Sequence, residues 1–166
     1  MYILPELCCT TIPHPMSFDM LKWIVLAVLL LIVGTLAIMS FLTRETVIRS
    51  ESHPDLQPCP DTPNCVSSLS PAGKSRIDAF AISNENPAQS WQRLIQAIEQ
   101  TGGKVVRHDD RYLHAVYTST VFRFKDDLEA VLGDGRIDIR SASRAGRSDF
   151  GKNRQRVELL REVYDG

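Results

Sequence analysis

Residues 112–139 read YLHAVYTSTVFRFKDDLEAVLGDGRIDI, and this stretch decides the fold class. Apolar and polar side chains alternate from Tyr112 to Ser119 and again from Val121 to Lys125, which is the period of β-strands. Residues 128–132 fit either a strand or a single helical turn, and periodicity leaves both open. The Gly-Asp-Gly sequence at 133–135 predicts a hairpin into the strand that follows.

The flanking sequence completes an α+β pattern. A short strand is expected around Ile77–Ile82, and Pro87 opens an amphipathic helix that Gly102–Gly103 ends. Val105–Val106 begins the run of strands, and a final helix is expected from about Asp149 to Tyr164. The predicted order is β-α-β-β-β-β-α. Short turns between consecutive strands imply an antiparallel sheet with two helices packed on one face.

An apolar run precedes this domain. Leu21–Leu42 carries one charge, Lys22, at its edge, and as a helix it would be about 33 Å long, enough to cross a hydrocarbon core of about 30 Å. A cleaved signal peptide has a shorter apolar region and a small-residue cleavage site, which this run lacks. A buried core helix would show a polar stripe. We therefore predict an uncleaved, single-pass transmembrane helix.

The helix sets the predicted division of the chain. The expected segments are a short disordered tail (1–20), the transmembrane helix (21–42), a proline-rich tether with a cysteine loop (43–72) and the α+β domain (73–166). Met16 or Met20 would fit a later start of the protein.

Two cysteines in the third segment are spaced for a disulfide. Cys59 and Cys65 enclose a ring of seven residues that Pro60 and Pro63 stiffen. In an oxidising compartment a bridge would stabilise this loop by about 2 kcal/mol. Free thiols in a reducing compartment are the alternative. A metal site is disfavoured because the spacing is C-x5-C and His53 is the one nearby imidazole.

The charge count and the cysteines favour opposite orientations of the domain relative to the membrane. Lys22 precedes the apolar run while Arg44 and Arg49 follow it, a count that slightly favours a cytoplasmic domain. A disulfide requires an oxidising compartment on the other side. We adopt the extracytoplasmic, periplasmic side as the expectation.

Three groups of motifs span most of the soluble part. They are CPDTPNCVSS (59–68); YLHA (112–115) with FRFKDDLE (122–129); and IDIRSASR (137–144) with SDFGKNR (148–154). Together they resemble the bacterial and plastid family called domain of unknown function 1499, with Ala130 and Arg147 standing where aromatic residues are expected. The family has no established activity, so the resemblance implies membership and no reaction. Its members commonly follow a signal or membrane segment, which also implies an extracytoplasmic domain.

Two strand residues raise the question of catalysis. Asp126 and Asp127 are neighbours, but successive side chains of a strand point to opposite faces and cannot share a substrate. In a regular strand, Asp126 would lie on the same apolar face as Leu128. We favour the interpretation that Asp126 instead lies in a helix cap or a turn. The alternative is a partly buried acid with a cationic partner. We interpret His114 as a surface or hydrogen-bonded residue, because no nucleophile motif accompanies it.

The stretch 134–161 is unusually basic, with eight Lys/Arg and four Asp/Glu. Ser148 or Asp149 is placed to cap the final helix, and a helix N-terminus flanked by arginines fits an anion site. The residues predicted for this site are Arg140, Ser143, Arg144, Asn153 and Arg154. The alternative is a solvated face whose charges pair internally.

These observations predict a membrane-tethered binding or interaction module of the cell envelope, whose ligand is an anionic small molecule or lipid head group. A second hypothesis is an enzyme of unknown type, for example a hydrolase, that uses His114, Asp126 and Arg140. A third is a structural envelope subunit. No pattern predicts a cofactor or a metal. Nucleic acid is not expected, because Phe150 is the one aromatic residue of the basic stretch before Tyr164.

Overall fold

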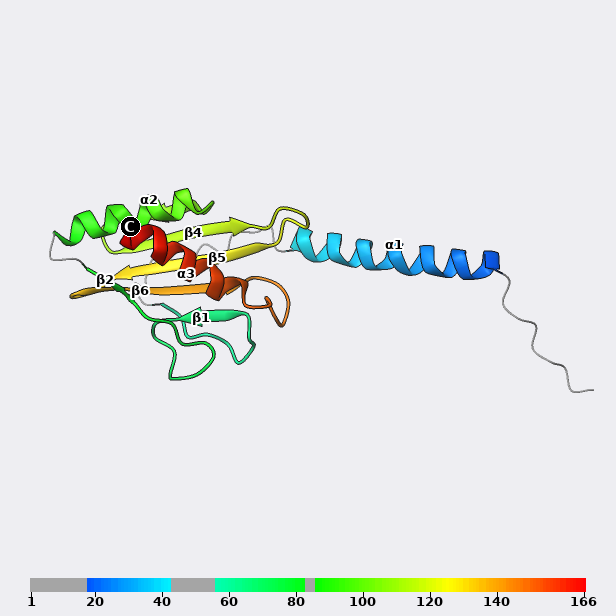
Figure 1. Cartoon of the computed structure of the whole chain (residues 1–166), viewed down its shortest axis with the longest axis horizontal. Coiled ribbons are helices and arrows are strands. Elements are labelled where there is room, and N and C mark those ends of the chain that lie inside the picture. Colours follow the sequence, from blue (N-terminus) through cyan, green and yellow to red (C-terminus); the bar gives the residue numbers. More distant parts are fainter. Residues whose placement is uncertain (1–17, 43–55, 83–85) are drawn as a thin grey trace, which may run out of the picture. The chain divides into compact units, whose positions relative to one another are not determined.

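The computed structural model describes residues 18–42, 56–82 and 86–166, and Figure 1 shows these parts in colour. The chain divides into two compact units, residues 1–35 and 36–166. The N-terminal tail up to residue 17 and most of the predicted tether, residues 43–55, lie outside the described residues.

The helix α1 (Phe18–Leu42) covers the apolar run as one continuous element. Its stretch Phe18–Phe41 is long and apolar enough to cross a bilayer. Large apolar side chains such as Leu30, Leu31 and Phe41 are exposed, which suits a lipid environment better than water. This finding indicates a membrane anchor.

The rest of the chain forms one antiparallel sheet and two helices (Figure 1). The elements are β1 (Cys65–Ser67), β2 (Phe80–Ala81), α2 (Pro87–Gln100), β3 (Lys104–His108), β4 (Tyr112–Thr118), β5 (Lys125–Leu132), β6 (Arg136–Ser143) and α3 (Lys152–Asp165). The strands lie in the order β1-β6-β5-β4-β3, and β2 pairs with the same edge of β6 as β1. The α+β class and the predicted order of elements are confirmed.

Three local features differ from the sequence prediction or were left open by it. The strand β1 was not predicted, because a three-residue strand in a proline-rich segment has no measurable periodicity. Residues 121–124 form a turn rather than a strand. The turn is closed by a hydrogen bond of 2.9 Å from the Ser119 amide to the Phe124 carbonyl. The ambiguous stretch 128–132 belongs to the strand β5.

The start and end of α2 follow from single residues. Asn86 is the N-cap and accepts a hydrogen bond from the Ala88 amide at 3.0 Å, and Pro87 occupies the first turn, where no amide hydrogen is needed. After the helix, Gly103 has no room for a side chain, because a Cβ would lie 2.6 Å from the Ile98 side chain and 2.7 Å from the Tyr117 ring.

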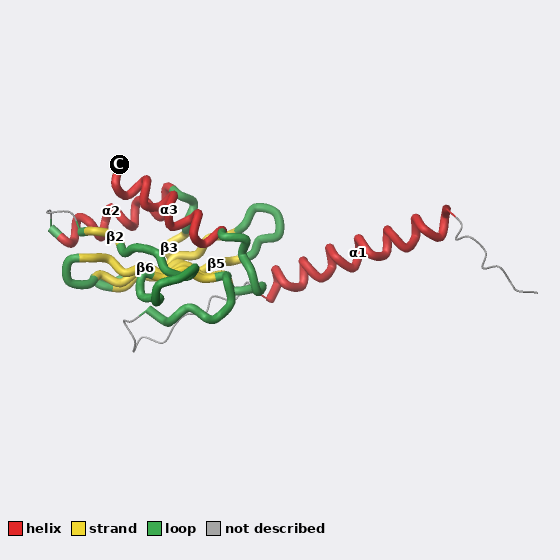
Figure 2. Tube along the Cα trace, turned by 60° about the horizontal axis from the view of Figure 1, so that its bottom comes forward, coloured by secondary structure: helices red, strands yellow, loops and turns green. Residues whose placement is uncertain are grey.

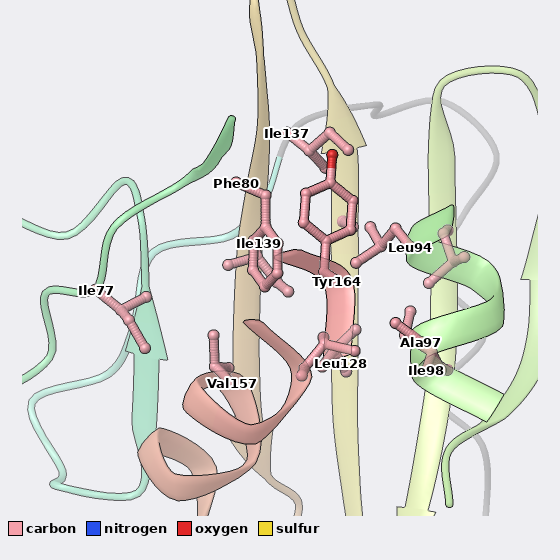
Figure 3. Packing of buried hydrophobic residues seen from close by; sticks show 14 of the residues in the cluster. Ile77, Phe80, Leu94, Ala97, Ile98, Leu128, Ile137, Ile139, Val157 and Tyr164 are labelled. Carbon is pink, nitrogen blue, oxygen red and sulfur yellow. The ribbon is translucent and has the colours of Figure 1, made fainter. Parts of the chain in front are cut away.

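The hydrophobic core lies between the sheet and the two helices, as Figure 3 shows. Leu94 and Ile98 of α2 and Leu160 of α3 are fully buried against Leu128 and Ile139 of the sheet. The ring of Phe80 packs edge-on against Tyr164 with centroids 5.1 Å apart. Burying apolar side chains of this size contributes about 1.5–3 kcal/mol each, so this layer holds the fold together.

The two faces of the sheet are covered differently (Figure 2). Both helices pack on one face, and the loop that contains Pro58 and Cys59 lies against the other, beside polar residues of β4, β5 and β6. We call these the helix side and the loop side. Because β4 is buried from Tyr112 to Tyr117, alternating residues on both of its faces are covered.

Candidate functional site

The loop side of the sheet carries a row of ionisable residues set by strand register. His114 of β4 is paired with Glu129 of β5, and Glu129 is paired with Arg140 of β6. Side chains directly opposite each other on adjacent strands lie about 4.5–5.5 Å apart at their Cβ atoms, so three ionisable groups form one row. Asp127 and Arg144 extend this row toward the end of β6.

His114, Asp127 and Arg144 form one hydrogen-bonded group. The His114 Nε2 lies 2.7 Å from the Asp127 Oδ1. Arg144 donates to both oxygens of the same carboxylate, from Nε at 2.8 Å and from Nη2 at 2.6 Å. Burial acts to raise the pKa of Asp127, but the hydrogen bonds from Arg144 and His114 outweigh it and hold that pKa below its usual value. Asp127 is therefore a carboxylate that orients the imidazole.

Tyr112, Glu129 and Arg140 form a second group. The Tyr112 hydroxyl donates to Glu129 Oε1 at 2.8 Å, and Arg140 Nη1 donates to Glu129 Oε2 at 3.0 Å. The Arg140 Nε is also buried, and it is the one buried side-chain nitrogen without a hydrogen-bond partner among the described residues. Such an atom in a folded protein requires a physical explanation, since more than nine in ten buried polar groups are satisfied.

Both groups open into one pocket of about 540 Å³. The residues that line it are Gln57, Pro58, Cys59, Pro60, His114, Asp127, Glu129, Arg140, Ala142, Ser143 and Arg144. Its loop wall is fixed to the sheet by the predicted Cys59–Cys65 disulfide, which the structure contains, with an S–S distance of 2.03 Å. Cys65 itself belongs to β1, so the bridge ties the wall to the strand next to β6.

Three of the five residues predicted for an anion site line this pocket, namely Arg140, Ser143 and Arg144. Arg154 does not join them. Its Nη2 donates to the main-chain carbonyls of Lys74, at 2.8 Å, and of Arg76. Arg154 lines a separate groove of about 970 Å³ between the 58–76 loop and the start of α3.

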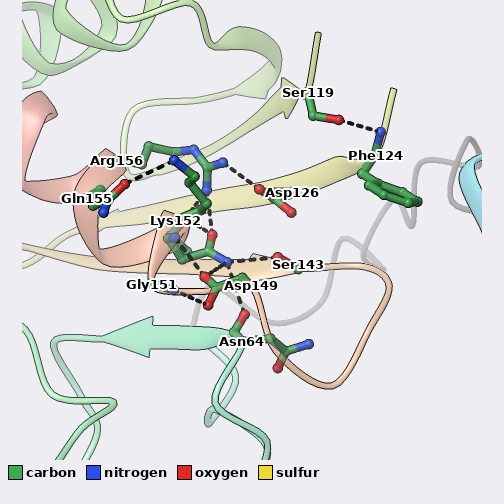
Figure 4. Close-up of polar contacts among 12 residues, drawn as sticks. Asn64, Ser119, Phe124, Asp126, Ser143, Asp149, Gly151, Lys152, Gln155 and Arg156 are labelled. Atoms are coloured by element: carbon green, nitrogen blue, oxygen red, sulfur yellow. Dashed lines mark hydrogen bonds and ion pairs between the residues drawn. The ribbon is translucent and has the colours of Figure 1, made fainter. Parts of the chain in front are cut away.

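Asn153 lies on the helix side, where it joins three segments through Asn64, Ser143 and Asp149, the residues that Figure 4 labels. Its Nδ2 donates to the Asn64 carbonyl at 3.1 Å, to Ser143 Oγ at 2.9 Å and to Asp149 Oδ2 at 2.8 Å, and its Oδ1 accepts from Ser141 Oγ at 2.6 Å. Asn153 is fully buried. With its amide already satisfied, it connects α3, β6 and the cysteine loop.

The start of α3 differs from the prediction. The helix begins at Lys152 after Gly151, which has a left-handed φ of 79° and provides no side-chain cap. Asp149 still serves the helix end, because its carboxylate accepts from the amides of Gly151 at 3.0 Å and Asn153 at 2.7 Å. Burial acts to raise the pKa of Asp149, but these bonds hold it below its usual value.

Asp126 neither caps a helix nor turns the chain. It lies within β5 on the helix side, where Arg156 of α3 pairs with its carboxylate. The Arg156 guanidinium stacks on the Tyr117 ring, 4.6 Å from its centroid. Asp126 is therefore the partly buried acid with a cationic partner that was the alternative interpretation of the sequence. Because Asp126 lies on the helix side and His114 on the loop side, the two side chains are separated by the sheet. Asp127, which was not predicted to act, lies beside His114 instead.

Sequence reasoning missed Asp127 and Glu129 as pocket residues, and Tyr112 as the hydrogen-bond partner of Glu129. Alternation does place Asp127 and Glu129 on one face of β5, opposite Leu128. The missing information was the register between strands, which joins that face to His114 and Arg140. Within the described residues, no group of three or more His, Cys, Asp and Glu side chains is placed to hold a metal ion.

The fold and the site together define a class of protein. It is an α+β domain that follows an apolar helix long enough to cross a bilayer, and it has a polar, charge-paired pocket on the side of its sheet away from α2 and α3. The family described as "Protein of unknown function (DUF1499)" matches residues 55–163, and the chain belongs to this family. No curated protein matches the chain. The family match confirms the resemblance that the sequence motifs indicated.

Proposed function

We propose that this protein is a membrane-anchored binding module whose pocket takes a small anionic ligand that presents a carboxylate or a phosphate. The domain is proposed to lie on the extracytoplasmic side. Support for that side comes from the Cys59–Cys65 disulfide, since such bridges persist in oxidising compartments.

The observation that carries the proposal is the Arg140 guanidinium. Its Nη1 is held by Glu129, while its buried Nε has no partner among the described residues. An unsatisfied buried donor costs about 1–3 kcal/mol, and more for a charged group, so a ligand that turned the guanidinium and gave Nε an acceptor would recover a substantial free energy. Arginine is also the residue best suited to planar carboxylates and phosphates, because its donors form a fixed fork.

Thermal denaturation of the purified full-length chain in detergent tests the proposal, with a panel of phosphates and carboxylates as ligands. A ligand at about 100 times its Kd adds about 2.7 kcal/mol to the free energy of unfolding. Arg140→Lys keeps the charge but removes the Nε donor, so it should abolish this gain. Arg136→Ala is the matched control, because Arg136 lies on the same strand with its side chain 57% exposed.

The outcomes separate the accounts. Stabilisation that survives in Arg136→Ala and disappears in Arg140→Lys supports the pocket. Stabilisation that is equal in wild type and Arg140→Lys, or that no anion of the panel produces, refutes it.

A second function, acid–base catalysis, is favoured by one contact. The Asp127 carboxylate holds His114 Nε2 at 2.7 Å, and a neutral imidazole bonded in this way keeps Nδ1 as a proton acceptor. A carboxylate that orients a histidine in a pocket is the arrangement used for general bases. In this alternative, Asp127 takes the part that the sequence had given to Asp126.

Chromogenic esters of phosphate and carboxylate test this alternative. A rate above the background of buffer that His114→Gln removes, with ligand-induced stabilisation retained, would support catalysis. Equal rates for wild type and His114→Gln would remove the enzyme hypothesis and leave the binding module.

A further inference from the structure

One end of the sheet carries exposed apolar side chains that the pocket does not use. The turn after β4 and the loop after β6 meet there, and the Arg144 amide donates to the Lys125 carbonyl at 3.2 Å (Figure 1). We call residues 119–125 and 145–152 the tip. Val121 is 79% exposed, Phe122 40% and Phe150 89%, although burial is the usual state of such side chains.

The backbone of the tip is also unusual. Arg123 and Phe150, with φ of 59° and 54°, are the non-glycine residues in the left-handed region among the described part of the chain. Bulky residues rarely adopt this conformation, which costs of order a kcal/mol and occurs where the surroundings or a function require it. At Phe150 the result is a ring that points away from the domain's own core.

The tip also contains basic residues. Arg123, Lys125, Arg147 and Lys152 belong to the tip, and Asp149 is its one acidic residue. Arg123, Arg147 and Lys152 are exposed. Exposed aromatic and aliphatic side chains together with Lys and Arg are the composition of surfaces that insert into the interface of an anionic bilayer.

The tether keeps a bilayer within reach of the domain. Residues 43–55 separate α1 from Leu56, and a chain of this length extends over at most about 45 Å, at roughly 3.5 Å per residue. Pro58 and Cys59 line the pocket with Ser143 and Arg144, so the chain enters the domain near the end of β6 that continues into the tip. A short tether gives an effective concentration of order millimolar, so weak contacts suffice for docking.

We infer that the tip docks on the surface of the bilayer that holds α1, with Val121, Phe122 and Phe150 in the interface and the basic residues on anionic lipid head groups. This docking surface rests on the proposed membrane anchor. It is independent of the ligand pocket on the loop side.

Quenching by lipids with brominated acyl chains tests the inference on the full-length chain in nanodiscs that hold one chain each. Trp23→Phe removes the tryptophan of α1, and the buried Trp91 remains as a constant background. Phe122→Trp then places a reporter in the tip. Leu159→Trp is the matched control, since Leu159 is exposed to a similar degree, 49%, but lies on α3.

With phosphatidylglycerol in the nanodisc, the reporter at position 122 should lose about half of its emission, because interfacial side chains lie at the acyl boundary, while the reporter at position 159 should change little. Adding Arg123→Glu and Arg147→Glu should reduce the quenching at position 122 to the level of position 159.

Each remaining outcome overturns the inference in a recognisable way. Equal quenching at both positions, in a chain that stays in the nanodisc, refutes the docking surface alone. A chain that does not stay in the nanodisc removes the anchor and the docking surface together. Protection of position 122 that appears only with two chains in one nanodisc would identify a second copy as the occupant. None of these outcomes changes the thermal test of the pocket.

Discussion

Asp126 and Asp127 are adjacent in the sequence, and each is paired with an arginine, but the two pairs differ in what surrounds them. Asp126 meets Arg156 on the helix side, between the sheet and α3, where the Tyr117 ring covers the guanidinium. Asp127 meets Arg144 and His114 on the loop side, where all three line a pocket. The same chemistry is enclosed in one case and accessible to a ligand in the other.

The comparison shows why a buried ion pair is by itself weak support for a functional site. Desolvation opposes the Coulomb attraction in any buried pair, so such pairs occur in structural roles as well. The loop side differs by its pocket and by the Arg140 Nε, which has no hydrogen-bond partner among the described residues. We therefore expect changes on the helix side to alter stability alone, and changes on the loop side to alter ligand binding.

The largest expected effect is on the helix side. Phe80 is fully buried between Tyr164 and the Arg161 guanidinium, which lies 4.3 Å from the centroid of its ring. Phe80→Ala should lower the free energy of unfolding by about 3–5 kcal/mol, because it removes a large apolar side chain and leaves a cavity. Urea denaturation measures this change. At temperatures where the variant is folded its ligand affinity should equal that of wild type, and a lost affinity would contradict the separation of the two sides.

A smaller effect is expected from the loop wall. Replacing Cys59 and Cys65 by serine removes a cross-link over seven residues, which should cost about 2 kcal/mol in the chain-entropy model. Because Cys59 also lines the pocket, anion affinity should fall with it. Urea denaturation with and without reductant measures both proteins. Wild type that loses no stability on reduction would show that the bridge does not hold the wall.

The smallest effect is expected from acidification. The pKa of Asp127 is lowered in the folded state, so its contribution to stability is present above the unfolded-state pKa of about 4 and is lost as the pH falls through the folded-state value. Asp127→Asn should therefore be less stable than wild type at pH 7 and should lose less stability below pH 4. Denaturation midpoints between pH 2 and pH 7 provide the measurement, and parallel curves would exclude this role of Asp127.

The sequence predicts which side chains share a face of a strand, but it does not predict which residues of other elements contact that face. A period of two placed Asp126 with Leu128 and separated it from Asp127, as the structure confirms. The partners of both acids depend on strand register and on the position of α3, which are tertiary features. Likewise β1 has three residues and is held by its pairing with β6, so no local pattern indicates it.

The candidate site was predictable in part for the same reason. Arg140 and Arg144 were predicted to belong to one anion site, and they line one pocket. Arg154 and Asn153 were grouped with them because they are close in sequence. The turn through Gly151 and the hydrogen bonds of Asn153 to three segments place these two residues elsewhere.

The most direct test compares two arginine side chains in one sample. The Nε–H resonances of Arg140 and Arg156 can be followed by ¹⁵N-correlated NMR of the full-length chain in detergent during titration with inorganic phosphate. The proposal predicts that the Arg140 resonance shifts and saturates, because its buried Nε gains an acceptor, while the Arg156 resonance stays in place beneath the Tyr117 ring. An Arg140 resonance that does not move at saturating phosphate, or that moves together with Arg156, would contradict the account.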